Sequence, residues 1–309
     1  MRVYRNLDTL PLFNDAVVTI GTFDGVHLGH QEIIKQLVKE SIKNGGESVL
    51  ITFYPHPRKI INPDLNLQQL TTLEERISLL KQYGISNLVV VPFTKAFSDL
   101  TADQYIRNFL VQKFQPSTII IGYDHRFGRN REGDFKMLEA NASAYDYRVK
   151  EIDEELINDA IISSTKIRKA LAIGNIDTAN TYLGYSYFFK GVVIEGNKLG
   201  RTIGFPTANL QITDSDKLIP GNGVYTVTAQ LEGDARILKG MMNIGTRPTI
   251  DGTNRIIEVH LFDFNEDIYG RHLKVWIHHF LRAEMKFQNL EALQEQLQID
   301  QLQTIERLN

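Results

Sequence analysis

The first half of the chain alternates short apolar runs with amphipathic segments, and this alternation limits its fold more than any other feature. The apolar runs have the length and composition of buried strands: Val17–Ile20, Val49–Phe53, Leu88–Val91 and Thr118–Ile121. Between them, apolar residues recur at helical spacing over residues 33–42, 73–83 and 105–110. Strands and helices in strict turn predict a parallel sheet covered by helices, which binds ligands at the carboxyl ends of its strands.

The second half, after about Tyr185, has a different pattern. Short stretches rich in β-formers and punctuated by glycine cover residues 188–195, 223–231, 241–244, 256–262 and 273–280. They predict an antiparallel sheet or barrel, and apolar residues from Leu290 to Leu308 predict a terminal amphipathic helix. Because 309 residues are enough for two domains, we predict an α/β, Rossmann-like domain over residues 1–183. An antiparallel β-barrel domain follows over residues 184–309.

Composition narrows the classes of function. A formal net charge of −3 gives no support to binding of nucleic acids or membrane surfaces. The absence of cysteine excludes disulfides, thiolate catalysis and cysteine-based metal sites, and it suits a reducing compartment. The first residues lack the apolar core of a signal peptide, and no stretch reaches the roughly 18 apolar residues of a membrane span. We expect a cytoplasmic monomer or weak homo-oligomer that acts on small molecules, with no nucleic-acid or membrane partner.

A glycine-rich loop follows the first apolar run. Residues Gly21–His30 (GTFDGVHLGH) lead directly into the first amphipathic segment. Glycine lets the backbone approach an anion, and a helix N-terminus offers free N–H donors and a positive dipole end. His27 and His30 are three residues apart and can face the same phosphates, which favours nucleotidyl transfer. One alternative is a glycine-rich turn with two surface histidines. A zinc-binding pair is another, which the lack of cysteine and of a nearby Glu-x-x-His disfavours.

This loop resembles the phosphate-binding motif of the HxGH nucleotidyltransferase superfamily, which includes adenylyltransferases and class I aminoacyl-tRNA synthetases. Three further segments resemble the bacterial bifunctional riboflavin kinase/FAD synthetase family: Thr52–Pro57 (TFYPHP), Gly122–Gly128 (GYDHRFG) and Ile162–Arg168 (ISSTKIR). The resemblance implies that this half joins FMN to the AMP moiety of ATP and releases pyrophosphate. The chain departs from the family at His125, where Phe is common, in a position that shapes the nucleotide or flavin pocket.

The resemblance implies catalytic roles for His27 and His30 and nucleotide binding by residues at the strand ends. The nucleotide-binding residues are Gly21, Phe23, Asp24, Gly25, His56, Gly122, Asp124, Ser163, Ser164, Thr165 and Arg168. Two prolines aim His56 over the strand ends, and the turn after the fourth run lies where a ribose would be recognised. The hydroxyls and the arginine of the last segment would hold the leaving pyrophosphate. The alternatives are a structural loop histidine, an ordinary polar loop and a plain helix N-cap.

The longest motif of the second half, Gly191–Leu210 (GVVIEGNKLGRTIGFPTANL), resembles the phosphate loop and magnesium site of riboflavin kinase. It matches neither a Walker loop nor the protein-kinase motifs. The resemblance assigns nucleotide binding to Gly196, Lys198, Gly200, Thr207 and Asn209, and Mg²⁺ binding to the last two. Side chains two apart in an extended segment share a face, and two neutral oxygen ligands completed by phosphates and water suit Mg²⁺. The alternative is a glycine-rich hairpin with a Pro-Thr turn.

Two later segments complete the predicted kinase site. Glu258 lies in a strand pattern, and its family equivalent activates the ribityl hydroxyl of riboflavin for attack on the γ-phosphate of ATP. His260, on the same face, is a candidate helper or a structural residue. The segment FLRAEMKF resembles the one that borders the flavin, so Leu281, Arg282 and Met285 are expected to contact it. The alternatives are an exposed strand glutamate and a hydrophobic strand that passes into a capped helix.

Motifs in family order in both halves thus predict an enzyme that converts riboflavin to FMN and FMN to FAD, with ATP and Mg²⁺. No nucleophilic cysteine or nucleophile elbow is present, so we expect direct transfer without a covalent enzyme intermediate. Three rivals stay open. They are an HxGH adenylyltransferase for a nicotinamide or pantetheine phosphate fused to a flavin-sensing barrel, a non-catalytic flavin carrier, and a barrel that serves only assembly.

Overall fold

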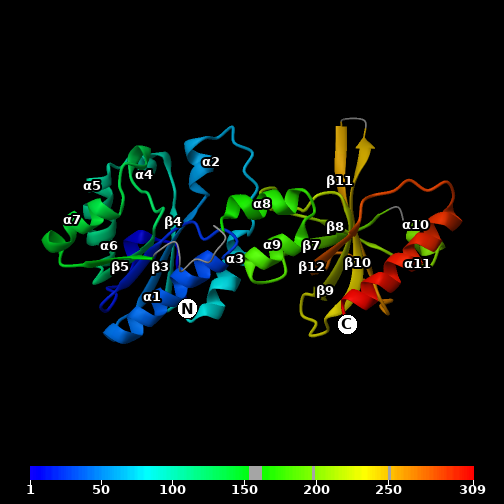
Figure 1. Ribbon diagram of the computed structural model, residues 1–309, viewed down its shortest axis with the longest axis horizontal. Helices are drawn as coiled ribbons and strands as arrows, with labels where there is room; N and C mark the ends of the chain where they lie inside the picture. Colours follow the sequence, from blue (N-terminus) through cyan, green and yellow to red (C-terminus); the bar gives the residue numbers. More distant parts are fainter. Residues whose placement is uncertain (153–161, 197–198, 250–251) are drawn as a thin grey trace. The chain divides into compact units, whose positions relative to one another are not determined.

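The computed structural model of the protein describes residues 1–152, 162–196, 199–249 and 252–309 (Figure 1). Contacts divide the chain into two compact units, Met1–Ser163 and Ser164–Asn309. None of the described helices is long and apolar enough to span a lipid bilayer.

The first unit is built on a six-stranded sheet in which every pairing is parallel. Its strands are β1 (Arg2–Tyr4), β2 (Val17–Ile20), β3 (Ser48–Tyr54), β4 (Asn87–Pro92), β5 (Thr118–Gly122) and β6 (Arg148–Ile152). The order is β1-β4-β3-β2-β5-β6, so the direction of winding reverses at β2, between β3 and β5. Sheets of this kind bind ligands at such a switch point, beyond the carboxyl ends of the strands.

Helices connect these strands. They are η1 (Leu7–Thr9), α1 (Leu28–Asn44), α2 (Pro57–Ile61), α3 (Leu73–Leu80), η2 (Lys81–Tyr83), α4 (Lys95–Ser98), α5 (Ala102–Gln104), η3 (Tyr105–Val111), α6 (Gln112–Phe114), η4 (Arg129–Arg131) and α7 (Phe135–Tyr145). One buried cluster joins Val18 and Ile20 of the sheet to Phe109 and Leu110 of η3. α1 contacts β2, β3 and β5, so the element that follows the glycine-rich loop is packed on the centre of the sheet.

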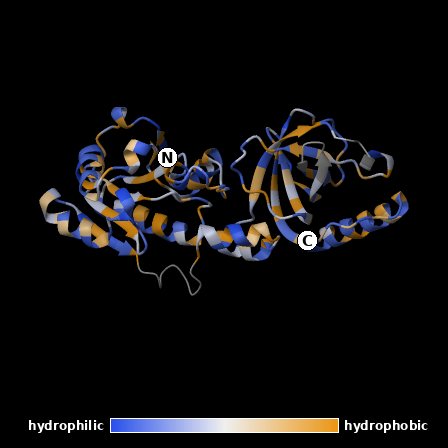
Figure 2. Ribbon diagram, turned by 90° about the horizontal axis from the view of Figure 1, so that it is seen from above, coloured by the Kyte–Doolittle hydropathy of each residue, from blue (hydrophilic) through white to orange (hydrophobic). Residues whose placement is uncertain are grey.

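The second unit is a closed antiparallel barrel in the order β10-β11-β8-β7-β12-β9. Its strands are β7 (Phe188–Ile194), β8 (Ala208–Gln211), β9 (Gly223–Leu231), β10 (Leu238–Thr249), β11 (Gly252–Leu261) and β12 (His272–Arg282), with α10 (Leu199–Thr202) before β8. Val227, Val259 and Ile277 are fully buried. Figure 2 shows hydrophobic and hydrophilic residues alternating along the barrel strands. Closure leaves no free sheet edge.

Three helices complete the second unit: α8 (Ser164–Ala172), α9 (Ile176–Leu183) and the terminal α11 (Leu290–Arg307). The domain boundary predicted at 183/184 therefore differs from the division of contacts after Ser163. The reason is physical, because α9 is bonded to the barrel: the Asn180 Nδ2 donates to the Ile277 carbonyl oxygen at 2.9 Å, and its Oδ1 accepts from the Tyr187 N at 2.7 Å. The parallel sheet, the antiparallel barrel and the terminal helix themselves are confirmed.

Candidate active sites

The glycine-rich loop leaves β2 at the switch point of the sheet. The Gly21 N donates to the Ile51 carbonyl oxygen of β3 at 3.0 Å, so the loop starts in register with the sheet. Phe23, Gly25 and Val26 then have φ angles of 48°, 83° and 40°. Phe23 and Val26 are in the left-handed region that side chains with a Cβ seldom adopt. The loop is thus a strained turn that delivers the chain to the N-terminus of α1.

The two histidines of the loop lie against each other. The His27 Nδ1 accepts from the backbone N of His30 at 3.4 Å and caps α1. The two imidazole rings are stacked, with centroids 3.6 Å apart and planes 17° apart, and the Phe23 ring lies 5.0 Å from that of His30. The two imidazoles therefore lie together at the N-terminus of α1, and their joint contact with an anion stays a prediction. Such an arrangement can stabilise charge on a phosphate.

Asp24 has a different environment from the one expected of a residue that contacts a nucleotide. It is fully buried, and its carboxylate accepts hydrogen bonds from the backbone N of Leu70 and of Thr71, each at 3.0 Å. The Arg76 guanidinium lies 3.8 Å from it. The carboxylate is thus turned toward the body of the unit, and its predicted contact with the nucleotide stays a prediction.

The other predicted residues of this unit follow the strands on either side of β2. His56 comes after β3, is buried, and caps α2 by accepting from the Arg58 N at 3.2 Å. Gly122 ends β5, and Asp124 lies exposed in the turn that follows. Because β3, β2 and β5 are neighbours and parallel, these residues lie at the carboxyl ends of the strands, on the same side of the sheet as the glycine-rich loop.

His125 lies in the turn that follows β5, and the pKa of its imidazole is unusual. Burial, with a smaller contribution from the nearby Arg131, lowers the pKa of its imidazole to about 4. Its Nε2 has no hydrogen-bond partner among the described residues. The ring is therefore neutral at neutral pH and keeps an uncommitted polar atom.

The predicted pyrophosphate-binding residues fall at the division between the units. Ser163 is the last residue of the first unit, whereas Ser164, Thr165 and Arg168 belong to α8 of the second. Thr165 is exposed, and the other three are part-buried. The predicted set is thus shared between the two units along the chain, and its joint role stays a prediction.

In the barrel, strand register brings three polar side chains into one row. Glu258 of β11 is paired directly with Asn209 of β8 on one side and with Asn243 of β10 on the other. Residues directly opposite in a sheet present their side chains on the same face. All three are part-buried. The predicted general base and one predicted Mg²⁺ ligand therefore lie side by side, although they are 49 residues apart (258 − 209) in the sequence.

The loop before β8 is fitted tightly to this row. A side chain at Gly196 would overlap the Asn209 amide, and one at Gly200 would overlap the Phe205 carbonyl oxygen. The His260 Nδ1 is 2.7 Å from the Pro206 carbonyl oxygen, so the ring donates this hydrogen bond, and burial lowers its pKa. His260 thereby fixes the residue just before Thr207. Lys198, predicted to bind the nucleotide, lies outside the described residues.

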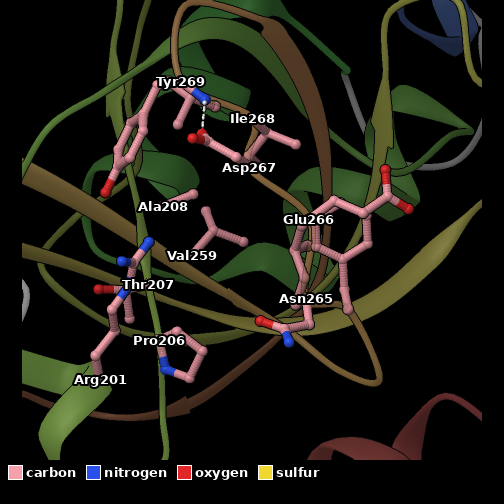
Figure 3. Close-up of a pocket in the computed structure, with 13 residues that line it drawn as sticks. Arg201, Pro206, Thr207, Ala208, Val259, Asn265, Glu266, Asp267, Ile268 and Tyr269 are labelled. Atoms are coloured by element: carbon pink, nitrogen blue, oxygen red, sulfur yellow. Dashed lines mark hydrogen bonds between the residues drawn. The ribbon is translucent and has the colours of Figure 1, made fainter.

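Thr207 also borders a pocket that the sequence did not reveal (Figure 3). Arg201 and Pro206 line it from the loop, whereas Glu266, Asp267 and Tyr269 come from the connection between β11 and β12. The Asp267 Oδ1 accepts from the Tyr269 N at 3.1 Å and holds that connection in a turn. The sequence offered only this short Asp-x-Tyr-Gly turn as a signal, and such turns are common.

The donors around Thr207 suit magnesium. Thr207 is exposed and Asn209 part-buried, and each supplies a hard, neutral oxygen. Among the described residues, no group of three or more His, Asp or Glu side chains is arranged to hold a metal ion. A site that relies on two protein oxygens and on nucleotide phosphates is what Mg²⁺ generally uses, so the residues present fit the predicted ion.

The predicted flavin-binding segment is anchored to the terminal helix. The Arg282 Nε donates to the Asp300 Oδ1 at 2.9 Å, and its Nη2 donates to the Oδ2 at 2.7 Å. This bidentate pair is largely buried and fixes α11 to the end of β12. Leu281 is part-buried and Met285 is exposed. A flavin contact by these residues stays a prediction.

Stacked histidines at the switch point of a parallel sheet, together with a glutamate among amides on a closed barrel, define a two-unit transferase of phosphate-containing groups. A family model described as FAD synthetase matches residues 11–166, and one described as riboflavin kinase matches residues 183–308. The chain belongs to the family of bifunctional riboflavin kinases/FMN adenylyltransferases.

Individual relatives agree along nearly the whole chain. The bifunctional riboflavin kinase/FMN adenylyltransferase of Escherichia coli K12 is 36% identical over 302 residues, spanning 98% of this chain and 95% of the relative. The enzyme of the same name from Listeria monocytogenes is 37% identical over 290 residues, spanning 93% and 91%. A crystal structure described as a macrolide-efflux protein from Streptococcus pneumoniae has a TM-score of 0.88 and 31% identity, covering 98% of this chain and 97% of that one.

Proposed function

We propose that the protein makes FMN from riboflavin on the barrel. It makes FAD from FMN at the carboxyl ends of the strands of the parallel sheet, and ATP is the second substrate of each reaction. The observation that carries this proposal is the presence of both families' regions in one chain, and it is supported by the neighbouring positions of His27 and His30 and of Glu258 and Asn209. Family membership also favours this reading over the three rivals, since each of them lacks at least one of the two reactions.

In the kinase reaction, Glu258 accepts the proton of the terminal ribityl hydroxyl of riboflavin. The alcohol oxygen attacks the γ-phosphorus of ATP in line, the bond to the β–γ bridging oxygen breaks, and ADP leaves. Thr207 and Asn209 would hold Mg²⁺, which when bound supplies positive charge against the phosphates. Asn209 and Asn243, the two neighbours of Glu258, orient the carboxylate by their position in the same row.

In the adenylyl transfer, a phosphate oxygen of FMN attacks the α-phosphorus of ATP, and pyrophosphate leaves. The stacked His27 and His30 and the first N–H groups of α1 stabilise the charge on the α-phosphate. The predicted residues Ser163, Ser164, Thr165 and Arg168 would hold the leaving pyrophosphate. The expectations of a cytoplasmic location and of a monomer or weak homo-oligomer complete the proposal, and light scattering of the purified protein tests the latter.

The test uses the full chain with riboflavin, ATP and Mg²⁺, followed by chromatographic separation of the flavins. Glu258→Ala should abolish FMN formation and leave FAD formation from supplied FMN intact, with Glu258→Gln as the control that keeps the shape of the side chain and removes its basicity. His30→Ala should do the reverse. Wild-type enzyme that forms neither flavin, or variants that lose both activities in parallel, would contradict the proposal.

A further inference from the structure

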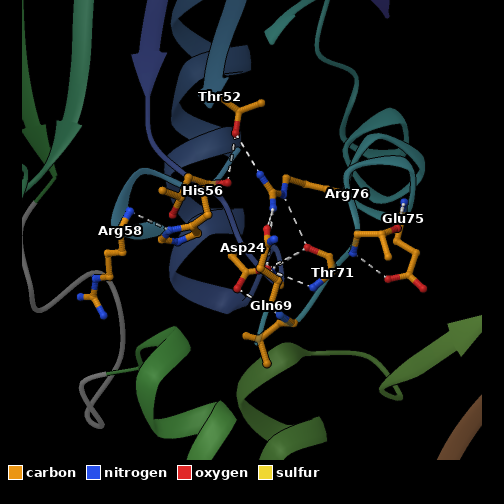
Figure 4. Close-up of polar contacts among 12 residues, drawn as sticks. Asp24, Thr52, His56, Arg58, Gln69, Thr71, Glu75 and Arg76 are labelled. Carbon is orange, nitrogen blue, oxygen red and sulfur yellow. Dashed lines mark hydrogen bonds and ion pairs between the residues drawn. The ribbon is translucent and has the colours of Figure 1, made fainter. Parts of the chain in front are cut away.

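Beneath the glycine-rich loop lies a buried set of polar side chains, shown in Figure 4. Asp24 is fully buried, and besides the two backbone N–H groups of Leu70 and Thr71 it accepts a hydrogen bond from the Thr71 Oγ1 at 3.1 Å. The same Thr71 hydroxyl oxygen accepts from the Gly25 N at 3.1 Å. One hydroxyl therefore holds two successive residues of the loop.

Arg76, from α3, completes this set. Only 1% of it is exposed. Its Nη2 donates to the Gln69 Oε1 at 3.2 Å, its Nη1 to the Thr52 Oγ1 at 3.3 Å, and its Nε to the Thr71 Oγ1 at 3.5 Å. The Thr52 hydroxyl in turn donates to the Thr22 carbonyl oxygen at 3.0 Å. Through these contacts a single guanidinium braces the loop from Thr22 to Gly25.

The loop needs such bracing because its backbone is strained. Phe23 and Val26 have φ angles of 48° and 40°, and a β-branched residue with positive φ is unusual. Strained residues of this kind persist only where the surrounding structure fixes them, and they cluster at functional sites. Here Val26 comes immediately before His27, and Phe23 lies four residues before it. Their conformation sets where the imidazole pair lies.

A buried ion pair is a poor device for stability alone, because the cost of removing two charges from water offsets most of their attraction. Arg76 is also too deeply buried to contact a substrate. The geometry points to a different role: we propose that Arg76, with Thr71 and Asp24, is a set of positioning residues that holds the HxGH loop in the conformation used for adenylyl transfer. This inference rests on the proposed FAD synthesis at that loop and assigns Asp24 to anchoring the loop.

The test compares two variants of Thr71 in the full chain. Thr71→Val keeps the volume and removes the hydroxyl, whereas Thr71→Ser keeps the hydroxyl and removes a methyl group. With FMN and ATP as substrates, Thr71→Val should lower kcat for FAD formation by about 10- to 100-fold, the range expected when reacting groups are displaced by about 1 Å. KM for ATP should change by less than about threefold, because no contact with the nucleotide is lost. Thr71→Ser should retain most of the activity.

Riboflavin phosphorylation in the same samples is the internal reference and should stay within about twofold of wild type, because none of these residues belongs to the barrel unit. Amide exchange in β2 and α1 of Thr71→Val should match wild type. Arg76→Lys, which keeps the charge and loses the planar fork, should reproduce the kcat effect of Thr71→Val.

Four outcomes would overturn the inference. Two concern kcat for FAD formation: an unchanged value in Thr71→Val, or equal decreases in Thr71→Val and Thr71→Ser. The other two are a rise in KM for ATP at constant kcat and a loss of amide protection in Thr71→Val in proportion to its loss of activity. If wild-type enzyme makes no FAD, the proposed function itself fails. Active wild type with an equally active Thr71→Val removes only the positioning role.

Discussion

His125 illustrates how one side chain couples the stability of the sheet unit to pH. Its folded pKa of about 4 lies below the ordinary value of 6.5, because burial disfavours the imidazolium. Between these two values the unfolded chain binds a proton that the folded unit does not bind. The stabilising contribution of the neutral ring is therefore complete above pH 6.5 and is lost as pH falls toward 4, by up to about 1.4 kcal/mol per pH unit.

Replacing this ring by phenylalanine, which does not titrate, should remove that dependence. We expect the stability of the first unit in His125→Phe to decline less between pH 6.5 and 4 than in wild type. Amide exchange in β5 and α7, corrected for the intrinsic effect of pH, measures the difference. Equal pH dependence in the two proteins would show that His125 is not buried as a neutral group.

For individual residues, the sequence predicted which ones lie in the glycine-rich loop better than it predicted which groups each of them contacts. The spacing of His27 and His30 predicted that the two imidazoles lie on one turn, but it predicted neither the capping of α1 by His27 nor the stacking of the two rings. The burial of Asp24 was not predicted either, because its partners lie 46 and 47 residues further along the chain. Local motifs carry no information about such distant contacts.

Among the elements, the strands that face two hydrophobic layers were predicted and the edge strands were not. β2, β3, β4 and β5 are nearly continuous apolar runs because both of their faces are buried. β6 reads Arg-Val-Lys-Glu-Ile and is mostly exposed at the edge of the sheet, so it offers no such run. β8 was read only as an extended segment, since its four residues pair over a very short length.

The connection between β7 and β8 should tolerate no side chain at its start. In Gly196→Ala the new Cβ would overlap the Asn209 amide, which must move from its place opposite Glu258. We expect riboflavin phosphorylation to fall by about 10-fold or more, with FAD formation from FMN unchanged. Gly233→Ala is the matched control: its φ is 80° and nothing lies near the added atom, so it should cost about 1 kcal/mol of stability and leave phosphorylation unaffected. Unaltered phosphorylation in Gly196→Ala would contradict this account.

At the scale of the whole molecule, the change in sequence pattern and the division of contacts lie at different places. The pattern changes near Tyr185 because the barrel strands begin there. The contacts divide after Ser163 because α8 and α9 pack on the barrel: the Gly221 N donates to the Leu171 carbonyl oxygen at 2.9 Å. Periodicity reveals where one kind of element replaces another, but not which neighbour a helix packs against.

A fragment experiment separates these two boundaries. We expect residues 164–309 to fold and phosphorylate riboflavin, and residues 184–309 to be less stable. The longer fragment keeps buried Leu171, Ile176 and Leu183, and burial of each such side chain contributes about 1.5–3 kcal/mol. Trp276, the single tryptophan of the chain, lies in β12, so its fluorescence during urea unfolding reports on the barrel. Equal midpoints for the two fragments would show that the helices add nothing to it.

The proposed role of α8 limits how the two activities can be separated genetically. If Ser164, Thr165 and Arg168 hold the leaving pyrophosphate, FAD synthesis uses residues that lie in the same unit as the kinase barrel. Gene fission after Ser163 would then preserve the first reaction of the pathway and abolish the second. Selection for FAD synthesis would keep the two units in one reading frame even in a cell that obtained its FMN elsewhere.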